Sequence, residues 1–427
     1  MSATFLHLTL INFFLNAMVY SVHNFIIVIV GESGVADLNQ ILKLQVLYGI
    51  KFIAAMMFTS FCDKKGGHKY VLTISAVLFC SGALLLTKLE EFDEKIRFNF
   101  IIVGLFMYTV GNGGLFPIID SLTFKYLRKI GKTERIGRLR FAGSLGQLVS
   151  NFFLAFIHYL KKDTGCVKHI PNAYTCAAFA IVLSIISLLL STKNIYTEED
   201  AQIASERQKT SEIWENFKRL ITIVSFCYFI SVLFAGIDRQ GISNFLTMYF
   251  GKVGVATSAI HVILLWRTLP ELIIYGLSEF LARFLALDVI FMMAIFITVS
   301  RSFFYAFVDV SDFTEKQKFF FSLFSETSKG FYSALFHYSA MRIFNSFADS
   351  KNVSIAQGAF YSAYNSLPYM AFPLFSPLFA KSKDKHITLA ELQTLFKLVG
   401  TIAILGLVGP IVRLFHKGMK SKKCQFV

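Results

Sequence analysis

The residues best suited to chemistry lie where two long apolar segments meet. Asp120 is near the end of the segment 98–124, and Arg138 and Arg140 stand at the start of the segment 139–160. A charged side chain at a membrane-spanning segment is energetically costly and usually has a function. The planar guanidinium of arginine binds hydroxyl pairs, carboxylates or phosphates through two hydrogen bonds. The pattern predicts contact with a small polar solute, and a structural salt bridge between Asp120 and a basic neighbour is the alternative.

The composition favours a membrane protein. Of the 427 residues, 55% are hydrophobic and only 16% are charged, whereas ordinary soluble domains are about 25% charged. The six cysteines include no CxxC pair and no spacing typical of a zinc site or a disulfide framework. The chain also lacks a phosphate-binding GxxxxGKS/T loop and a GxSxG nucleophile motif. We therefore expect no enzyme activity, no metal and no cofactor.

The apolar segments predict about twelve membrane-spanning helices, because a helix needs about 20 apolar residues to cross a bilayer. They are expected at 4–30, 40–61, 70–87, 98–124, 139–160, 173–192, 220–250, 256–278, 284–307, 318–344, 354–380 and 389–415. The expected fold class is an all-α integral membrane protein with two six-helix bundles. The expected domains are an N-terminal bundle at 1–192, a polar linker at 193–219 and a C-terminal bundle with a basic tail at 220–427.

The charges of the loops predict the orientation. The loops after the second and fourth spans and the C-terminal tail are basic, whereas the loop from Glu90 to Glu94 is acidic. Lysine and arginine are enriched in cytoplasmic loops, so both termini and the linker are expected in the cytoplasm. Much of the net charge of +15 is then an orientation signal rather than a surface for nucleic acid. We expect a multi-pass monomer of the plasma membrane.

The loop after the second span carries a family resemblance. Residues 63–69 read Asp-Lys-Lys-Gly-Gly-His-Lys, which resembles the loop between the second and third helices of the major facilitator superfamily. Thr59 and Gly67 depart from that pattern, and a merely basic loop is the alternative interpretation. In the family this loop latches the ends of helices. The resemblance implies a conformational latch made by Asp63, Lys64 and Gly66.

Residues 120–146 resemble more specifically the branch that holds the lactose permease, the phenylpropionate permeases and the nucleoside–proton symporters. The matching parts are Asp120-Ser-Leu, a basic connector and a segment from Gly137 through Arg140 to Gly146. In the lactose permease the corresponding acid and second arginine bind sugar hydroxyls, which implies substrate contact by Asp120 and Arg140. Ala142 stands where the branch usually has an aromatic residue.

The resemblance continues, less closely, in the second half. Asp238-Arg-Gln and Asn244-Phe resemble a stretch of the permease's seventh helix, which implies substrate contact by Asp238 and Asn244.

Proton coupling is implied for four charged residues. Glu271 and Arg301 match positions in the eighth and ninth helices of the branch. The tenth span departs, because Glu326 and Lys329 stand where the lactose permease carries a histidine and a glutamate. A structural Glu–Lys pair is the alternative for the last two residues.

Polar side chains recur on one face of several spans. In the first span Asn12, Asn16, Tyr20 and His23 align, because side chains about one helical turn apart share a face. Facing a central cavity, such stripes would supply donors, acceptors and rings, and ordinary interhelical hydrogen bonding is the alternative. The substrate-binding residues expected on these stripes and beside them are Asn16, Tyr20, Lys51, Tyr361 and Asn365.

Cations slightly outnumber acids inside the spans. The candidate cations are Lys51, Arg239, Arg267, Arg301, Lys329 and Arg342, and the candidate acids are Asp120, Asp238, Glu271, Glu279 and Glu326. A cation-rich cavity would suit an anionic solute.

The resemblance implies a secondary active transporter that moves a small polar metabolite by proton-coupled alternating access. The Ser-Leu-Thr-Phe run after Asp120 is similar to that of the nucleoside symporters, which favours a nucleoside or purine nucleotide as substrate. Asp120 itself favours the alternative, a sugar or oligosaccharide. A second alternative is a non-transporting sensor, although such proteins usually lose their intramembrane charges. The expected partners are the solute, protons and the lipid bilayer.

Overall fold

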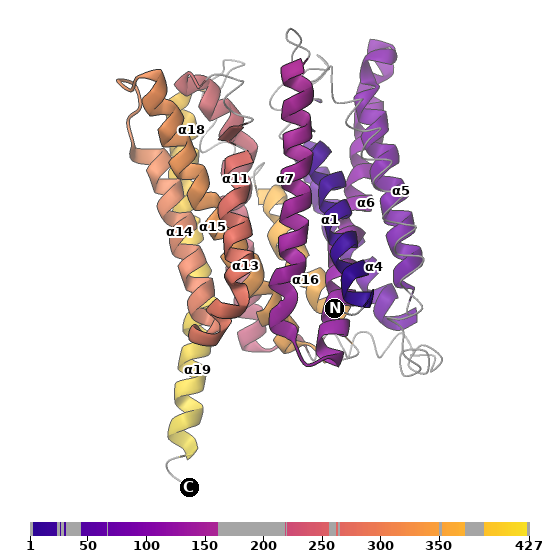
Figure 1. Ribbon diagram of the computed structural model, residues 1–427, viewed down its shortest axis with the longest axis vertical. Helices are drawn as coiled ribbons and strands as arrows, with labels where there is room; N and C mark the ends of the chain where they lie inside the picture. Colours follow the sequence, from indigo (N-terminus) through magenta and orange to yellow (C-terminus); the bar gives the residue numbers. More distant parts are fainter. Residues whose placement is uncertain are drawn as a thin grey trace.

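Long helices stand side by side in the computed structural model of the chain (Figure 1). The structure describes residues 3–23, 26, 30, 44–65, 67–160, 218, 220–255, 262, 263, 265–349, 352–371 and 388–424. Within these ranges every regular element is an α-helix or a 3-10 helix. The predicted sixth span, 173–192, and the predicted linker, 193–219, lie almost wholly outside the described residues.

The described residues of the first half form five long α-helices with short 3-10 turns. They are α1 (Ala3–His23), η1 (Gln45–Gly49), α4 (Ile50–Lys65), α5 (His68–Thr87), η2 (Leu89–Glu91), α6 (Glu94–Lys129), η3 (Thr133–Arg135) and α7 (Ile136–Leu160).

The described residues of the second half form seven α-helices and one 3-10 helix. They are α11 (Ile223–Val253), α13 (Thr268–Phe284), α14 (Leu287–Phe307), α15 (Glu315–Phe347), α16 (Val353–Asn365), α18 (Leu389–Ile404), η5 (Leu405–Leu407) and α19 (Val408–Cys424). Three of them begin at a threonine capping box, in which the threonine and the residue three positions later cap each other's backbone. These caps are Thr222, Thr314 and Thr388.

Seven helical segments among the described residues are long and apolar enough to cross a membrane. Of the eighth expected span, 256–278, the structure describes helical residues at 262, 263, 265 and 266 and then α13 from Thr268 onwards. The twelfth, 389–415, is interrupted by η5 and continues to Cys424 in α19, which projects beyond the bundle in Figure 1.

Glycines allow the closest helix contacts. A Cβ atom added at Gly111 of α6 would lie 2.3 Å from the backbone nitrogen of Phe79 in α5. One added at Gly146 of α7 would lie 2.0 Å from the carbonyl oxygen of Phe13 in α1. The backbones therefore touch where any side chain would separate them. These contacts fix α6 and α7, the two helices that carry Asp120 and Arg140.

The connector end is the lower end in Figure 1, where η3 joins α6 to α7 and where α11 and α16 begin. The far end is the upper end, where α6 begins and α11 ends.

Candidate functional site

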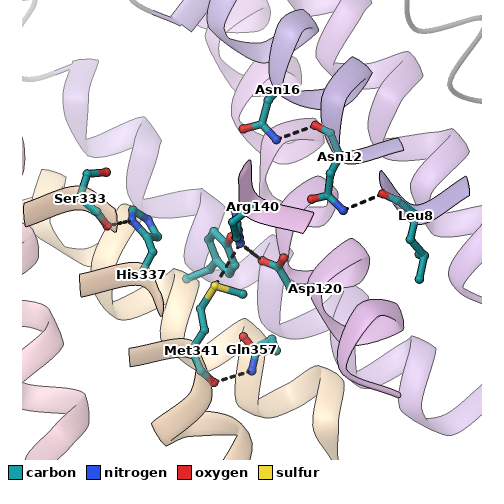
Figure 2. A network of polar contacts seen from close by, with 10 residues as sticks. Leu8, Asn12, Asn16, Asp120, Arg140, Ser333, His337, Met341 and Gln357 are labelled. Atoms are coloured by element: carbon teal, nitrogen blue, oxygen red, sulfur yellow. Dashed lines mark hydrogen bonds and ion pairs between the residues drawn. The ribbon is translucent and has the colours of Figure 1, made fainter. Parts of the chain in front are cut away.

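The predicted pair of Asp120 and Arg140 forms in the structure (Figure 2). The guanidinium of Arg140 donates from Nη2 to Oδ2 of Asp120 and to the hydroxyl of Tyr361, and the same nitrogen lies 3.2 Å from Sδ of Met341. The Tyr361 hydroxyl in turn donates to Oδ2 of Asp120 at 2.5 Å. Asp120 is 1% exposed and Arg140 8%. Such a buried, hydrogen-bonded charge pair needs every partner in place.

This cluster joins the two halves of the chain. Asp120 and Arg140 come from α6 and α7, whereas Met341 and Tyr361 come from α15 and α16. The sequence predicted Asp120, Arg140 and Tyr361 as site residues. It did not predict that Tyr361 would bridge the other two.

Asp63 forms a second link between the halves, at the connector end. Its carboxylate accepts hydrogen bonds from the backbone nitrogens of Ser354 at 3.3 Å and Ile355 at 2.9 Å, in the first turn of α16. A carboxylate is stabilised there by the unpaired N–H groups and the helix dipole. Lys125 of α6 lies 3.5 Å from the same carboxylate. Of the other predicted latch residues, the Lys64 side chain and Gly66 lie outside what the structure describes.

Two further contacts close the connector end. Arg128 of α6 donates to the carbonyl oxygens of Asn345 and Ala348 at the end of α15. The hydroxyls of Ser121 and Ser354 lie 2.5 Å apart. The charged and polar groups of α4 and α6 therefore hold α15 and α16 at this end.

Two adjoining cavities lie on the far side of this closed layer. The first has a volume of about 50 Å³ and the second about 200 Å³. They share Tyr20, His23, Gln147, Arg239 and Glu271 in their walls. The other polar residues lining the first are Asn16, Lys51, Asn112, Arg140, Ser144, Tyr275, His337, Tyr361 and Asn365. The other polar residues lining the second are Tyr48, Gln240, Ser243, Asn244, Arg267, Lys329, Ser333 and Tyr369.

The structure thus brings most of the predicted substrate residues to one place. Asn16 lines the first cavity and donates its amide to the carbonyl oxygen of Asn12 at 2.8 Å (Figure 2). Lys51 lines the same cavity and is 8% exposed. Asn365 lines it as the acceptor of a 2.5 Å hydrogen bond from Nη1 of Arg239. Asn244 lines the second cavity.

The cavity walls are strongly cationic. Among the described residues, five cationic side chains line the two cavities, and the only carboxylate that does so is Glu271. The cations are Lys51, Arg140, Arg239, Arg267 and Lys329. Of these, Arg140 is neutralised by Asp120 behind the wall, and Arg267 lies 3.9 Å from Glu326.

Arg239 was recognised from the sequence only as a candidate cation. In the structure it reaches both cavities, and its guanidinium lies 4.7 Å from the ring centroid of Tyr364. A signal was available, because Arg239 falls one residue after Asp238 and five before Asn244, in the stretch that resembles a substrate-binding helix.

The predicted proton-coupling residues divide into two groups. Glu326 is fully buried and accepts a 2.5 Å hydrogen bond from Arg301 and a 3.2 Å hydrogen bond from Tyr305. Glu271 faces the cavities and accepts from the hydroxyl of Ser333 at 3.1 Å.

The Glu326–Lys329 pair weighed from the sequence is not among the ion pairs of the described helices. The reason is that the guanidinium of Arg301 reaches Glu326 from α14. Lys329 instead lies 5.3 Å from the ring centroid of Tyr332 and lines the second cavity.

Asp238 stands apart from the site for which it was predicted. It has no exposed surface and does not line either cavity. Its carboxylate accepts hydrogen bonds from the hydroxyls of Thr298, at 2.5 Å, and Ser302, both on α14. Its side chain therefore points between α11 and α14, because the helical turn that brings Arg239 to the cavity turns the preceding residue away.

No group of three or more His, Cys, Asp and Glu side chains among the described residues has an arrangement that could hold a metal ion.

Known proteins resemble this chain over different lengths. Residues 5–370 match the MFS_1 like family. A probable triacylglyceride transporter of Mycobacterium leprae (strain TN) is 24% identical over 148 residues, which are 35% of this chain and 28% of that relative. The chain thus matches only about a quarter of the length of that curated relative.

Solved structures share the fold over almost the whole chain. A bacterial homologue of the human drug peptide transporters PepT1 and PepT2 superimposes with a TM-score of 0.68, 16% identity and coverage of 96% of this chain and 97% of that one. The proton:xylose symporter XylE superimposes with a TM-score of 0.65 and 12% identity, and the match covers 94% of both chains. The nucleoside transporter NupG superimposes with a TM-score of 0.61 and 15% identity, and the match covers 96% of this chain and 99% of that one. The chain therefore belongs to the MFS_1 like family and is a multi-pass membrane protein with the major facilitator fold.

Proposed function

We propose that the protein is a secondary active transporter that moves a metabolite with a planar ring, foremost an anionic purine nucleotide and next a neutral nucleoside, across a membrane by alternating access. The observation that carries the proposal is the charge of the two cavities, where five cations face one carboxylate among the described residues. Ions that remain unpaired in a membrane protein are costly and mark the path of a substrate or an ion.

Three of these cations are available to a solute. Lys51, Arg239 and Lys329 each line a cavity, and none forms an ion pair with a described carboxylate. A phosphate or carboxylate group of the solute would supply the missing negative charge. The fork of Arg239 suits a phosphate in two-point contact, whereas each lysine acts as a point charge.

The remaining lining suits a flat, polar ring. Five tyrosines line the cavities, and every nucleobase can stack on an aromatic ring. They are Tyr20, Tyr48, Tyr275, Tyr361 and Tyr369. Side-chain amides between them can donate to and accept from the edge of a base. These amides belong to Asn16, Asn112, Gln147, Gln240, Asn244 and Asn365.

The alternative of a sugar substrate rested on Asp120. In the structure Asp120 is buried behind the cavity wall and holds Arg140 and Tyr361. A sugar hydroxyl would first have to displace both partners. This weakens the sugar proposal without affecting a role for Arg140, which does line the first cavity.

The closed connector end suggests how transport proceeds. We place this end, both termini and the linker 193–219 in the cytoplasm of a monomer in the plasma membrane. The units 1–192 and 220–427 would then rock about the cavity, as in other transporters built from two repeated bundles. An anion bound to Arg140 competes with Asp120, which loosens the tie to Tyr361 and lets the cytoplasmic side open.

For proton coupling we propose Glu271 as the titrating group of the cavity. It is the carboxylate that faces the cations directly, so its protonation changes the charge that the solute meets. Arg301 and Glu326 form a buried ion pair outside the cavity walls, and Lys329 shares the second cavity with Glu271.

The test is uptake of radiolabelled ATP, GTP, adenosine, uridine, lactose and glucose into cells that express the protein. Lys51→Gln and Arg239→Gln should raise the KM for a nucleotide about tenfold or more, and affect a nucleoside less, because each removes a charge that meets the phosphate. Lys88→Gln, which changes an exposed lysine paired with Glu91, is the matched control and should leave uptake unchanged.

The outcomes separate the alternatives. Uptake of lactose or glucose that nucleotides and nucleosides fail to inhibit would establish the sugar alternative. The absence of uptake of any of these solutes, with the protein demonstrated in the membrane, would overturn the nucleotide proposal and favour the non-transporting sensor.

A further inference from the structure

The carboxyl group of Asp238 lies in a small polar cluster that the cavity does not use. Its two oxygens accept separately, Oδ2 from Thr298 and Oδ1 from Ser302. All three side chains are completely buried between α11 and α14. The cluster is therefore sealed from the cavity walls, although Arg239, the next residue, reaches both cavities.

Asp238 differs from the other buried carboxylates of the described helices in having no ion pair there. Asp120 is paired with Arg140, Glu326 with Arg301, and Asp288 with Arg413 at 3.1 Å. A buried carboxylate is strongly disfavoured when no cation compensates its charge, and it commonly avoids the cost by taking up a proton.

The charged and titratable groups that face Asp238 come from three helices. They are Arg301 on α14, Lys329 and Tyr332 on α15, and Tyr364 on α16. Arg301 already donates to Glu326, and Lys329 lines the second cavity. Neither cation is within ion-pair distance of Asp238.

The hydroxyl of Ser302 has two acceptors within reach. Besides Oδ1 of Asp238, its oxygen lies 2.9 Å from the carbonyl oxygen of Thr298, one turn earlier on α14. A serine hydroxyl has one hydrogen and two lone pairs. When Asp238 is ionised, Ser302 donates to it. When Asp238 is protonated, the carboxyl hydrogen can be donated to Ser302, which then donates to the Thr298 carbonyl.

Both protonation states therefore keep the cluster satisfied without moving a helix. The proton enters from solvent, attaches to one carboxyl oxygen and leaves by the same bond, so no other group is consumed. A buried polar group that can exchange one hydrogen-bond pattern for another avoids the cost of an unpaired atom in either state.

From this cluster we propose that Asp238 is a proton-binding site, separate from the cavity carboxylate Glu271, which carries one proton in this conformation. Its consequence for transport rests on the proposed function. With Asp238 neutral, the positive charge of Arg239 is not offset by its neighbour in the chain, and the cavity attracts an anion more strongly. The proton and the anionic solute would then be bound together and released together.

The experiment is infrared difference spectroscopy of the purified full-length protein in lipid nanodiscs, titrated over a range of pH. The carbonyl stretch of a protonated carboxyl group reports the proton directly. The protein carries Glu271→Gln, which removes the carbonyl band of the other proposed titrating group. In this background we expect a band that disappears on alkalinisation, that is absent when Asp238→Asn is added and that persists when Asp288→Asn is added. Asp288 is a matched control because it is also a buried aspartate with a hydroxyl donor, Tyr228, but it has a cation.

Ser302→Ala keeps the carboxyl group and covers the case in which Asp238→Asn does not fold. Removing a donor that stabilises the ionised form should let the band persist to higher pH. An unchanged titration of Ser302→Ala would overturn the exchange between the two hydrogen-bond patterns. The absence of the band in the Glu271→Gln background, or a band that survives there in folded Asp238→Asn, would overturn the proton site.

Two further results separate this inference from neighbouring ones. Loss of the band when sodium chloride is added at constant pH would show that the cluster takes a sodium ion, which would overturn a site for protons. The spectra need no solute, so a failure to find transport leaves the proton site standing, and a missing band leaves the transport proposal standing.

Discussion

The connector end and the far end of the bundle are held together by different chemistry. At the connector end the two halves meet through charges and buried hydrogen bonds, in which Asp63, Asp120, Arg128 and Arg140 take part. Towards the far end, among the residues that the structure describes, the halves meet through the stacked rings of Tyr48 and Tyr369, which line the second cavity and whose centroids are 4.6 Å apart.

The described contacts at the two ends should therefore separate at different cost in free energy. Leaving a buried charge without its partner costs about 3–5 kcal/mol, whereas separating an aromatic pair costs about 0.5–1.5 kcal/mol beyond the loss of buried area. The far-side contact can yield to thermal motion alone. The connector end needs a ligand that replaces a partner, and an anion held by Arg140 would do so.

The largest effect is expected for Arg140→Ala. The change leaves Asp120 buried and unpaired, so uptake should fall about 100-fold or more, from a penalty of about 3–5 kcal/mol. Arg138→Ala is the control, since Arg138 is 57% exposed and pairs with Glu279 at the surface. The control should change uptake by no more than about threefold.

A double variant sharpens this test. If Arg140 served only to neutralise Asp120, Asp120→Ala with Arg140→Ala would restore uptake, because no charge would remain unpaired. If Arg140 binds the solute, the double variant stays inactive while its thermal stability recovers. Equal losses in Arg138→Ala and Arg140→Ala would contradict the distinction between buried and exposed pairs.

The second effect concerns the latch. Asp63→Ala removes the acceptor of two backbone N–H groups at the start of α16 and the partner of Lys125. Each hydrogen bond to a charged group contributes about 1.5–3 kcal/mol. The loss of two of them should shift the protein towards the conformation that is open at the connector end.

Cys62 provides the measurement, because it is a free and buried thiol beside Asp63. In a variant that keeps only Cys62, alkylation by a membrane-permeant maleimide should become at least about tenfold faster in Asp63→Ala. The control is Asp93→Ala, because Asp93 is an exposed acid at the far end of the bundle, where α6 begins. This change should leave the rate unchanged. No acceleration in Asp63→Ala would mean that the latch does not hold this end closed.

The helical fold was largely predictable, because it depends on hydrophobic length. Apolar segments of about 20 residues at known spacing specify helices that cross a bilayer, and most of the predicted spans in the described ranges contain one.

The candidate site was predictable where its residues lie on one helix face. The stripe that includes Asn16 and Tyr20 was found by helical periodicity and does line the cavity. The contacts between distant helices were not predictable, because a sequence gives no register between α14 and its neighbours. The pairing of Glu326 with Arg301 and the burial of Asp238 against Thr298 both depend on that register.

A smaller effect is expected for Tyr361→Phe. The ring keeps its parallel contact with Phe116, with centroids 5.9 Å apart, while the hydroxyl that bridges Asp120 and Arg140 is lost. Because Asp120 and Arg140 still pair, the closed connector end should lose only about 1.5 kcal/mol of stability. The maleimide reaction at Cys62 should then be roughly tenfold faster. The KM for the solute should change little. A large rise in KM with an unchanged maleimide rate would make Tyr361 a substrate contact rather than a tie between the halves.

The smallest effect should come from the far side, with the opposite sign. Tyr48→Leu removes the stacking on Tyr369 and should favour opening there by about 0.5–1.5 kcal/mol. In a protein that alternates between two conformations, weakening the contacts at one end offsets the effect of weakening those at the other end.

Adding Tyr48→Leu to Asp63→Ala should therefore slow maleimide reaction at Cys62 about two- to tenfold. Phe152→Leu is the control, because Phe152 stacks on Phe156 of the same helix, α7, so this contact does not link the two halves of the chain. A faster reaction in the Tyr48 variant would mean that both ends loosen together, so the two ends would not be opposed.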